Sequence, residues 1–80
     1  MRITVNIYAR LRYYLRDQEG LFQEKEWSMP EGATIHSILE RIKLPEEVRI
    51  MVLLNNDSVD HEAALKEGDV VHILPMTTGG

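Results

Sequence analysis

The stretch at residues 34–44 limits the possible folds more than any other part of this 80-residue chain. Four apolar residues in it follow the spacing i, i+3, i+4, i+7, which places them on one face of a helix. Thr34 can cap the start of that helix, and Leu44 ends it because the residue before a proline avoids helical backbone. Such a helix needs a partner layer to cover its apolar face. The four apolar residues are Ile35, Ile38, Leu39 and Ile42.

The segments on either side of this helix have the patterns of β-strands. Residues 2–8 alternate apolar and polar side chains, and residues 50–54 are apolar throughout, which predicts a well-buried strand. Residues 21–29 predict a strand whose first half forms an edge, a bulge or a loop, because a lysine interrupts the alternation. Residues 70–74 predict the last strand, and residues 58–59 can add a very short one. Trp27 and Met29 would share the inner face of the second strand. In the last strand, Val71 and Ile73 would point to one side of the sheet, and Val70, His72 and Leu74 to the other.

Only short segments remain between these elements. Residues 9–16 fit one or two helical turns, with Leu11 and Leu15 on the apolar side. Residues 55–57 and 67–69 have the composition of tight turns. The stretch between these two turns holds at most one helical turn, so the chain has a single main helix.

One helix on one face of a small mixed sheet predicts an α+β fold of the β-grasp (ubiquitin-like) roll type, with four to five strands. A ferredoxin-like sandwich is the rival, but it needs a second full helix before the last strand. We expect residues 1–80 to form one domain, in which residues 75–80 are a flexible, extended tail that ends on Gly-Gly.

Composition excludes several classes of function. The chain has no cysteine, which removes disulfides, thiolate metal sites and a cysteine nucleophile. Its formal net charge of -4 lacks the basic footprint of a nucleic-acid-binding protein and suits a protein partner with a basic surface. No apolar run is long enough to span a membrane, and the first residues lack a signal-peptide pattern, so we expect a cytoplasmic protein.

The side chains do not form a recognisable catalytic or metal site. The three histidines, His36, His61 and His72, fall on different predicted elements and lack metal-ligand spacing. Ser58, Asp60 and His61 have the residue types of a catalytic triad, but residues this close together in a turn are more often bound to their own backbone.

The six residues from Pro75 to Gly80 contribute little to folding, since terminal glycines have no side chain to bury. A frayed end is one interpretation. The other is that the carboxylate of Gly80 is a substrate, handed into the active site of another protein. Transfer of this carboxylate to the α-phosphate of ATP would give an acyl adenylate, which a sulfur or amine nucleophile can attack. Gly79 and Gly80 would let the backbone approach a channel wall closely.

Arg10 and Arg12, together with Arg16, form the only basic cluster in the sequence. Such a cluster is usually a solvated face. The functional alternative is a docking patch for an acidic surface of a partner protein.

Three stretches of the chain resemble the MoaD/ThiS family of ubiquitin-like sulfur carriers, and its MoaD-like branch in particular. They lie in the order found in that family and span nearly the whole chain. They are Tyr8-Ala9-Arg10-Leu11-Arg12, Pro30-Glu31-Gly32-Ala33-Thr34, and Leu65-Lys66-Glu67-Gly68-Asp69-Val70-Val71 with Pro75 and the final Gly79-Gly80.

This resemblance implies a carrier with no catalytic side chains and no bound cofactor of its own. A ubiquitin-activating-type adenylyltransferase would use ATP to activate Gly80, whose carboxylate becomes a thiocarboxylate. The large subunit of molybdopterin synthase, or another sulfur acceptor enzyme, would then take the sulfur, for molybdenum cofactor biosynthesis in the first case. By position in the family, Gly79 and Gly80 form the reactive end. The residues expected to contact partners are Leu74, Pro75, Met76, Thr77 and Thr78.

The tail departs from the family pattern at one position, because Met76 follows Pro75 where two prolines are frequent. This leaves other sulfur carriers open, such as those that serve thiamin or cysteine synthesis. A protein modifier that forms isopeptide bonds with lysines and a plain β-grasp binding module are further alternatives.

Overall fold

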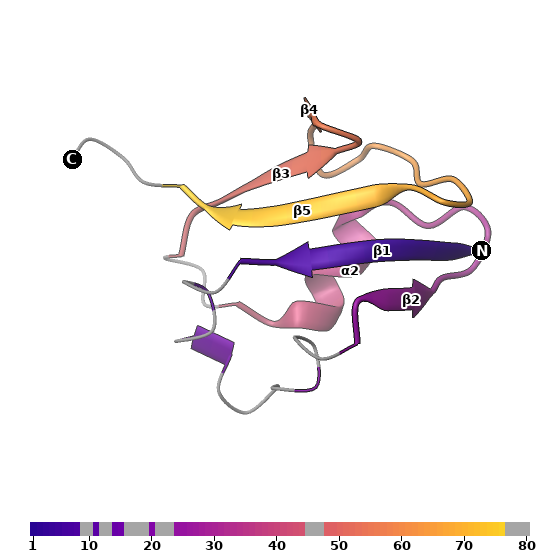
Figure 1. Ribbon diagram of the computed structural model, residues 1–80. Helices are drawn as coiled ribbons and strands as arrows, with labels where there is room; N and C mark the ends of the chain where they lie inside the picture. Colours follow the sequence, from indigo (N-terminus) through magenta and orange to yellow (C-terminus); the bar gives the residue numbers. More distant parts are fainter. Residues whose placement is uncertain (9–10, 12–13, 16–19, 21–23, 45–47, 77–80) are drawn as a thin grey trace.

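The predicted strands assemble into one mixed sheet with the order β2-β1-β5-β3-β4 (Figure 1). The structure is a computed structural model that describes residues 1–8, 11, 14–15, 20, 24–44 and 48–76. Strands β1 and β5 pair in parallel, whereas the other neighbouring strands are antiparallel. The first and last strands of the chain therefore lie side by side. The strands are β1 (Arg2–Ile7), β2 (Glu26–Ser28), β3 (Ile50–Leu54), β4 (Asp57–Ser58) and β5 (Val70–Pro75).

Helix α2 (Ile35–Ile42) covers one side of this sheet (Figure 1). The segment that precedes β5 binds the free N–H groups at the start of the helix. Ile35 donates its N–H to the carbonyl of Ala63 at 3.0 Å, and His36 donates to the carbonyl of His61 at 2.8 Å. This segment therefore caps α2 instead of forming a second helix, as the β-grasp prediction requires. The core cluster includes Ile3, Val5, Ile35, Ile38, Ile42, Val71 and Ile73.

The helix ends at Ile42, and the C-cap residue Lys43 adopts left-handed backbone with φ 58° and ψ 54°. Residues with a Cβ are strained in this region, and glycine is not. Lys43→Gly is therefore expected to raise the free energy of unfolding by about 0.5–1 kcal/mol. Urea denaturation measures this change. Glu40→Gly is the control, because a glycine inside the helix should lower stability by about 1 kcal/mol; a loss of stability in both variants would contradict the prediction.

Four strands differ in extent from those predicted, and β3 differs in burial. Strand β1 ends one residue earlier, at Ile7, and β4 lies one residue earlier, at Asp57–Ser58. Strand β2 has only three residues, although Trp27 and Met29 are buried as expected. Strand β5 continues through Pro75, one residue further than predicted. The prediction that the strand at residues 50–54 is well buried is wrong, since Met51 is 37% exposed.

The remaining features agree with the predicted architecture. Leu11 and Leu15 are fully buried, as the apolar side of a short helical segment should be. A helix on one side of a mixed sheet with adjacent parallel first and last strands is the β-grasp roll. No helix in the described part of the chain has the length and apolar character needed to cross a membrane.

A polar cluster ties the β3–β4 hairpin to the start of β5. Asn55 and Asn56 have positive φ, as a two-residue hairpin turn requires. Asn55 exchanges two hydrogen bonds with the backbone of Val70, and its side-chain amide donates to Asp69 Oδ1 at 3.0 Å. Asp69 Oδ2 also accepts the N–H of Lys66 at 2.7 Å. Among the described residues, Asp69 is the one polar or charged residue that is buried, and it is 5% exposed.

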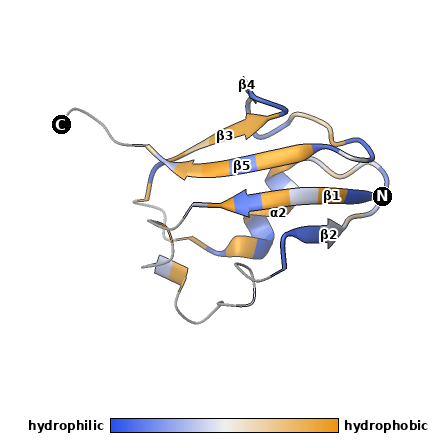
Figure 2. Cartoon of the chain, viewed as in Figure 1, coloured by the Kyte–Doolittle hydropathy of each residue, from blue (hydrophilic) through white to orange (hydrophobic). Residues whose placement is uncertain are grey.

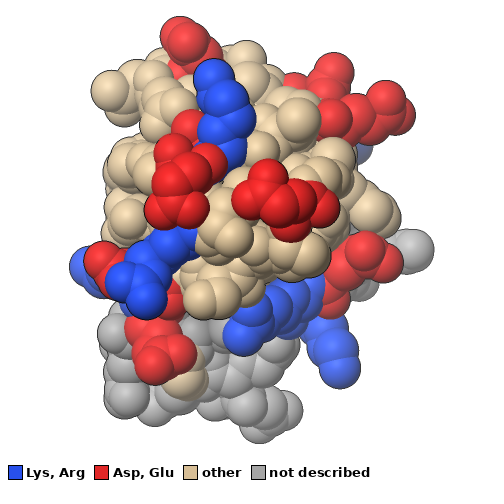
Figure 3. Space-filling view, turned by 90° about the vertical axis from the view of Figure 1, so that its right-hand side faces the viewer, with Lys and Arg blue, Asp and Glu red and all other residues tan. Residues whose placement is uncertain are grey.

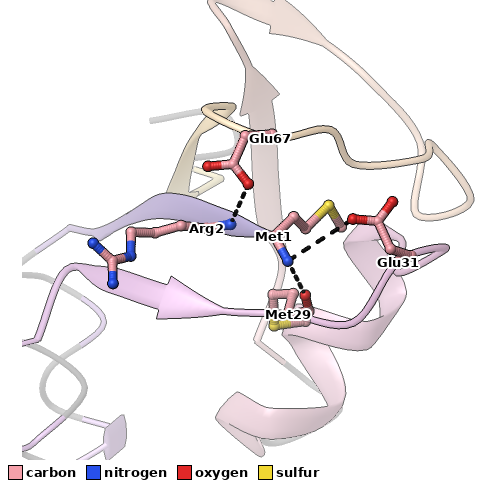
Figure 4. Close-up of polar contacts among 5 residues, drawn as sticks. All are labelled: Met1, Arg2, Met29, Glu31 and Glu67. Carbon is pink, nitrogen blue, oxygen red and sulfur yellow. Dashed lines mark hydrogen bonds and ion pairs between the residues drawn. The ribbon is translucent and has the colours of Figure 1, made fainter.

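Polar contacts also join elements at the end of the sheet where β1 begins (Figure 4). The Met1 amino group donates to the carbonyl of Met29 at 2.8 Å and lies 4.0 Å from the Glu31 carboxylate. Glu67 accepts the backbone N–H of Arg2 at 2.9 Å. Basic and acidic side chains are interspersed on this face (Figure 3). The end of β5 lies at the opposite end of the molecule (Figure 1).

Candidate docking face and tail base

The side of the sheet opposite α2 carries exposed and half-buried apolar side chains near the end of β5. Met51 on β3 lies directly opposite Leu74 on β5, and Leu53 lies opposite His72. Directly opposed residues of neighbouring strands place their side chains on the same face. Figure 2 shows β3 and the end of β5 as largely hydrophobic. We call Tyr8, Met51, Leu53, Leu74 and Met76 the open face.

The exposure of the open face exceeds what a packed core would leave. Tyr8 is 44% exposed, Met51 37% and Met76 43%, while Leu53 and Leu74 are half-buried. Apolar side chains gathered on one surface typically mark a site of protein interaction. The open face is therefore the candidate docking surface.

His72 lies within this apolar surface. In the sheet register it sits between Asn6 of β1 and Leu53 of β3. The Tyr8 ring packs edge-to-face against it, with 6.1 Å between ring centroids. His72 Nδ1 is buried and has no hydrogen-bond partner among the described residues. An apolar surface with one polar group of this kind can favour a particular partner geometry.

The tail leaves the sheet beside the open face. Pro75 pairs with Ile50, and Met76 donates its N–H to the carbonyl of Arg49 at 2.9 Å. The sheet thus holds the backbone as far as Met76. The part of the predicted six-residue tail that lies beyond this hydrogen bond is therefore four residues long, from Thr77 to Gly80. Four extended residues span at most about 14 Å.

The structure places only some of the predicted site residues. Leu74, Pro75 and Met76 are brought together at the tail base, beside the open face. Thr77, Thr78, Gly79, Gly80, Arg10 and Arg12 lie outside the described residues.

Sequence reasoning missed three members of the open face, namely Tyr8, Met51 and Leu53. The sequence contained one signal for this surface. Residues 50–54 are apolar on both faces of the predicted strand, whereas a single helix can cover only one face of the sheet.

His36 and Asp60, which the sequence offers as a possible metal ligand and a possible triad member, make local contacts in the structure. The described residues contain no group of three or more potential metal ligands. His36 is exposed and lies 3.8 Å from Glu40 on the same helix. Asp60 accepts the backbone N–H of Glu62 at 2.9 Å, which is the local turn bonding expected of this segment. These residues have local roles in the turns and on the helix surface.

Comparisons with known proteins agree with this geometry. The chain is similar to a Pyrococcus furiosus protein described as molybdopterin converting factor, subunit 1, with 27% identity, a TM-score of 0.75, and coverage of 96% of this chain and 99% of that chain. It is also similar to a chain in the BexX/CysO complex of Amycolatopsis orientalis, with 29% identity, a TM-score of 0.61, and coverage of 98% and 99%. SAMP1 of Haloferax volcanii, at 16% identity and a TM-score of 0.67 over both whole chains, shares the fold.

Comparison with curated protein sequences gave no match. The model of the ThiS family matches residues 5–80, which is nearly the whole chain and includes the two glycines of the tail. The chain therefore belongs to the ThiS family and has the ubiquitin-like β-grasp fold.

Proposed function

We propose that this protein is a sulfur carrier whose reactive group is the carboxylate of Gly80. The observation that carries the proposal is the position of the tail base, Leu74 to Met76, beside the open face. The ThiS-family match extends to Gly80, and the last strand ends beside an exposed apolar surface. A partner that covers the open face can receive the tail in the same encounter.

The proposed chemistry has two steps. The Gly80 carboxylate attacks the α-phosphate of ATP in the active site of a ubiquitin-activating-type adenylyltransferase, and pyrophosphate leaves. Hydrosulfide, or an equivalent sulfur donor, then attacks the acyl adenylate, and AMP leaves as the thiocarboxylate forms. The carrier contributes the substrate group and the docking surface, whereas the activating enzyme binds ATP. Because activation consumes ATP, the proposal places the carrier in the cytoplasm.

We further propose that the sulfur goes to molybdopterin, through the large subunit of molybdopterin synthase. The likeness to the Pyrococcus furiosus molybdopterin converting factor supports this acceptor. The likeness to a chain of the BexX/CysO complex supports a carrier that works while docked on another protein.

The mass of the carrier tests this function. Incubation with the adenylyltransferase, ATP and sulfide is expected to increase the mass by one oxygen-to-sulfur exchange, which fragmentation places at Gly80. An unchanged mass with an enzyme that forms the adenylate would contradict sulfur transfer. Conjugates of higher mass that disappear without Gly79 and Gly80 would instead identify a protein modifier.

A charge within the open face is expected to weaken docking. Met51→Asp places a carboxylate beside Leu74, where docking would remove it from water without a partner. We expect the Kd for the adenylyltransferase to rise at least about tenfold, with little loss of stability because Met51 is partly exposed. Isothermal titration calorimetry measures the Kd. Ser28→Asp is the matched control, since it adds the same charge at an exposed position of β2. Equal effects of the two variants would show that this surface does not dock.

A further inference from the structure

The two strands that flank β5 release it at different points along the chain. The described pairing with β1 ends where Ile7 lies beside Ile73, whose carbonyl accepts the N–H of Tyr8 at 3.0 Å. The pairing with β3 continues further, to Pro75 opposite Ile50. Figure 1 shows β5 between these two strands, with its C-terminal end beside the start of β3. Strand β3 is therefore the neighbour that holds the end of β5.

Proline is compatible with position 75 because of the side toward which its nitrogen faces. Successive residues of a strand direct their backbone polar groups toward alternate neighbouring strands. Ile73 faces β1, as its bond with Tyr8 shows, so Pro75 faces β1 as well, and its missing N–H removes a donor only on that side. Met76 faces β3 and donates its N–H to the Arg49 carbonyl at 2.9 Å. We call this hydrogen bond the anchor.

The anchor extends the ladder between β3 and β5 by one step beyond the last pair of the two strands. Hydrogen-bonded pairs recur at every second residue of an antiparallel ladder. The next such pair inward from Met76 and Arg49 is therefore Leu74 with Met51, which the register places directly opposite each other. If the anchor opens, β3 holds the backbone of β5 only as far as Leu74.

The anchor thus determines how much of the chain is left to span the distance to an enzyme. Four residues of the sequence follow Met76, and they reach at most about 14 Å when extended. Six residues follow Leu74, and they reach at most about 20 Å. A tether that is longer than its span lowers the effective concentration of its end, roughly as the −3/2 power of its length. An intact anchor therefore favours a partner whose site lies within the shorter reach.

We propose that Met76 is a positioning residue for the adenylation of Gly80, because its N–H on the Arg49 carbonyl fixes the point from which the tail reaches into the activating enzyme. The inference rests on the proposed function, in which Gly80 is the reactive end of the chain. It assigns the role to the backbone N–H of Met76 and not to the side chain. Every residue type except proline supplies this donor, so a proline at position 76 is the substitution that removes it.

Hydrogen exchange of the free carrier tests the anchor without any partner. The Met76 N–H is expected to exchange at least about twofold more slowly than the same N–H in a peptide of residues 73–80, because exchange requires the anchor to open. NMR of the intact carrier resolves this single amide. Exchange at the rate of the peptide would overturn the inference and leave the carrier function in place.

Two substitutions test the effect of the anchor on adenylation. Met76→Ala keeps the N–H donor and Met76→Pro removes it, while both remove the methionine side chain. ATP–pyrophosphate exchange with the adenylyltransferase measures kcat/KM for each variant. With a tail of full length, kcat/KM should be about twofold lower for Met76→Pro than for Met76→Ala, because the longer tether dilutes Gly80 at the active site.

Deleting Thr77 and Thr78 from both variants is expected to reverse this order. Both shortened chains still end on Gly79 and Gly80, so the reactive residue is unchanged. The shortened Met76→Ala chain must open its anchor to recover the lost reach, whereas the shortened Met76→Pro chain has no anchor to open. The shortened Met76→Pro chain should therefore be about two- to tenfold more active. A loss of folding alone would lower both values for Met76→Pro and could not produce this reversal.

Thr77→Pro is the matched control for the stiffness of proline, because it adds the ring beyond the anchor and leaves the Met76 donor in place. It should keep the kcat/KM of the wild type, and thermal unfolding verifies that each variant retains the sheet. The same order of activities before and after the deletion, or an equal loss in Thr77→Pro and Met76→Pro, would overturn the inference while leaving the carrier function in place. Absence of adenylation in the wild type would instead overturn the proposed function together with this inference.

Discussion

A chain shortened to end at Thr78 is expected to fold like the full-length protein and to form no adenylate with the activating enzyme. We expect the fold to tolerate loss of the two glycines, because the described pairing of β5 already reaches the Met76 N–H, which binds the Arg49 carbonyl. The shortened chain ends in a carboxylate too, but this group lies two residues, or about 7 Å, short of the position of Gly80. ATP–pyrophosphate exchange measures adenylation and is expected to fall to background, while thermal unfolding should be unchanged.

Two further variants separate the length of the tail from its composition. Thr78→Ser keeps the length and a hydroxyl side chain, so it should retain adenylation. Gly80→Ala keeps the length but adds a Cβ at the reactive residue, and it should be adenylated slowly if the channel of the enzyme is narrow. Adenylation of the chain that ends at Thr78 at the wild-type rate would sink the carrier proposal and favour a plain β-grasp binding module.

The fold could be predicted because its main elements have strong local patterns. The helical spacing of Ile35, Ile38 and Ile42 and the alternation in β1 and β5 depend only on nearby residues, and all of these elements are confirmed. The burial of β3 could not be predicted in the same way. A run of apolar residues does not reveal whether both faces of a strand are covered. Here the side chains of Met51 and Leu53 lie on the face of the sheet that α2 does not cover.

The candidate site was predicted only at the tail base. Leu74 and Met76 could be identified because they precede the Gly-Gly end of the sequence. Their neighbours on the open face depend on strand pairings between distant segments, such as Met51 with Leu74 and Asn6 with His72. No local pattern specifies these pairings, so the unpartnered Nδ1 of His72 becomes apparent only in the folded chain.

The loss of the Asp69 carboxylate is expected to have the largest effect on stability among the polar substitutions considered. Two donors depend on this buried group, the side-chain amide of Asn55 and the backbone N–H of Lys66. Asp69→Ala removes the acceptor of both donors, and the Asp69 residue that supplies it is only 5% exposed. The expected loss in the free energy of unfolding is about 2–4 kcal/mol, a large fraction of the stability of a small domain.

Urea denaturation of four variants tests this role of Asp69. Asp60→Ala is the matched control, because Asp60 also accepts a backbone N–H in a turn but is exposed, so its loss should cost less than about 1 kcal/mol. Asn55→Gly removes the partner amide and tolerates the φ of 52° at that position. The double variant Asn55→Gly/Asp69→Ala should lose less stability than the sum of the single losses, by about 0.5–3 kcal/mol, because the two side chains share one hydrogen bond. Additive losses, or equal losses for Asp60→Ala and Asp69→Ala, would show that this cluster does not hold the β3–β4 hairpin against β5.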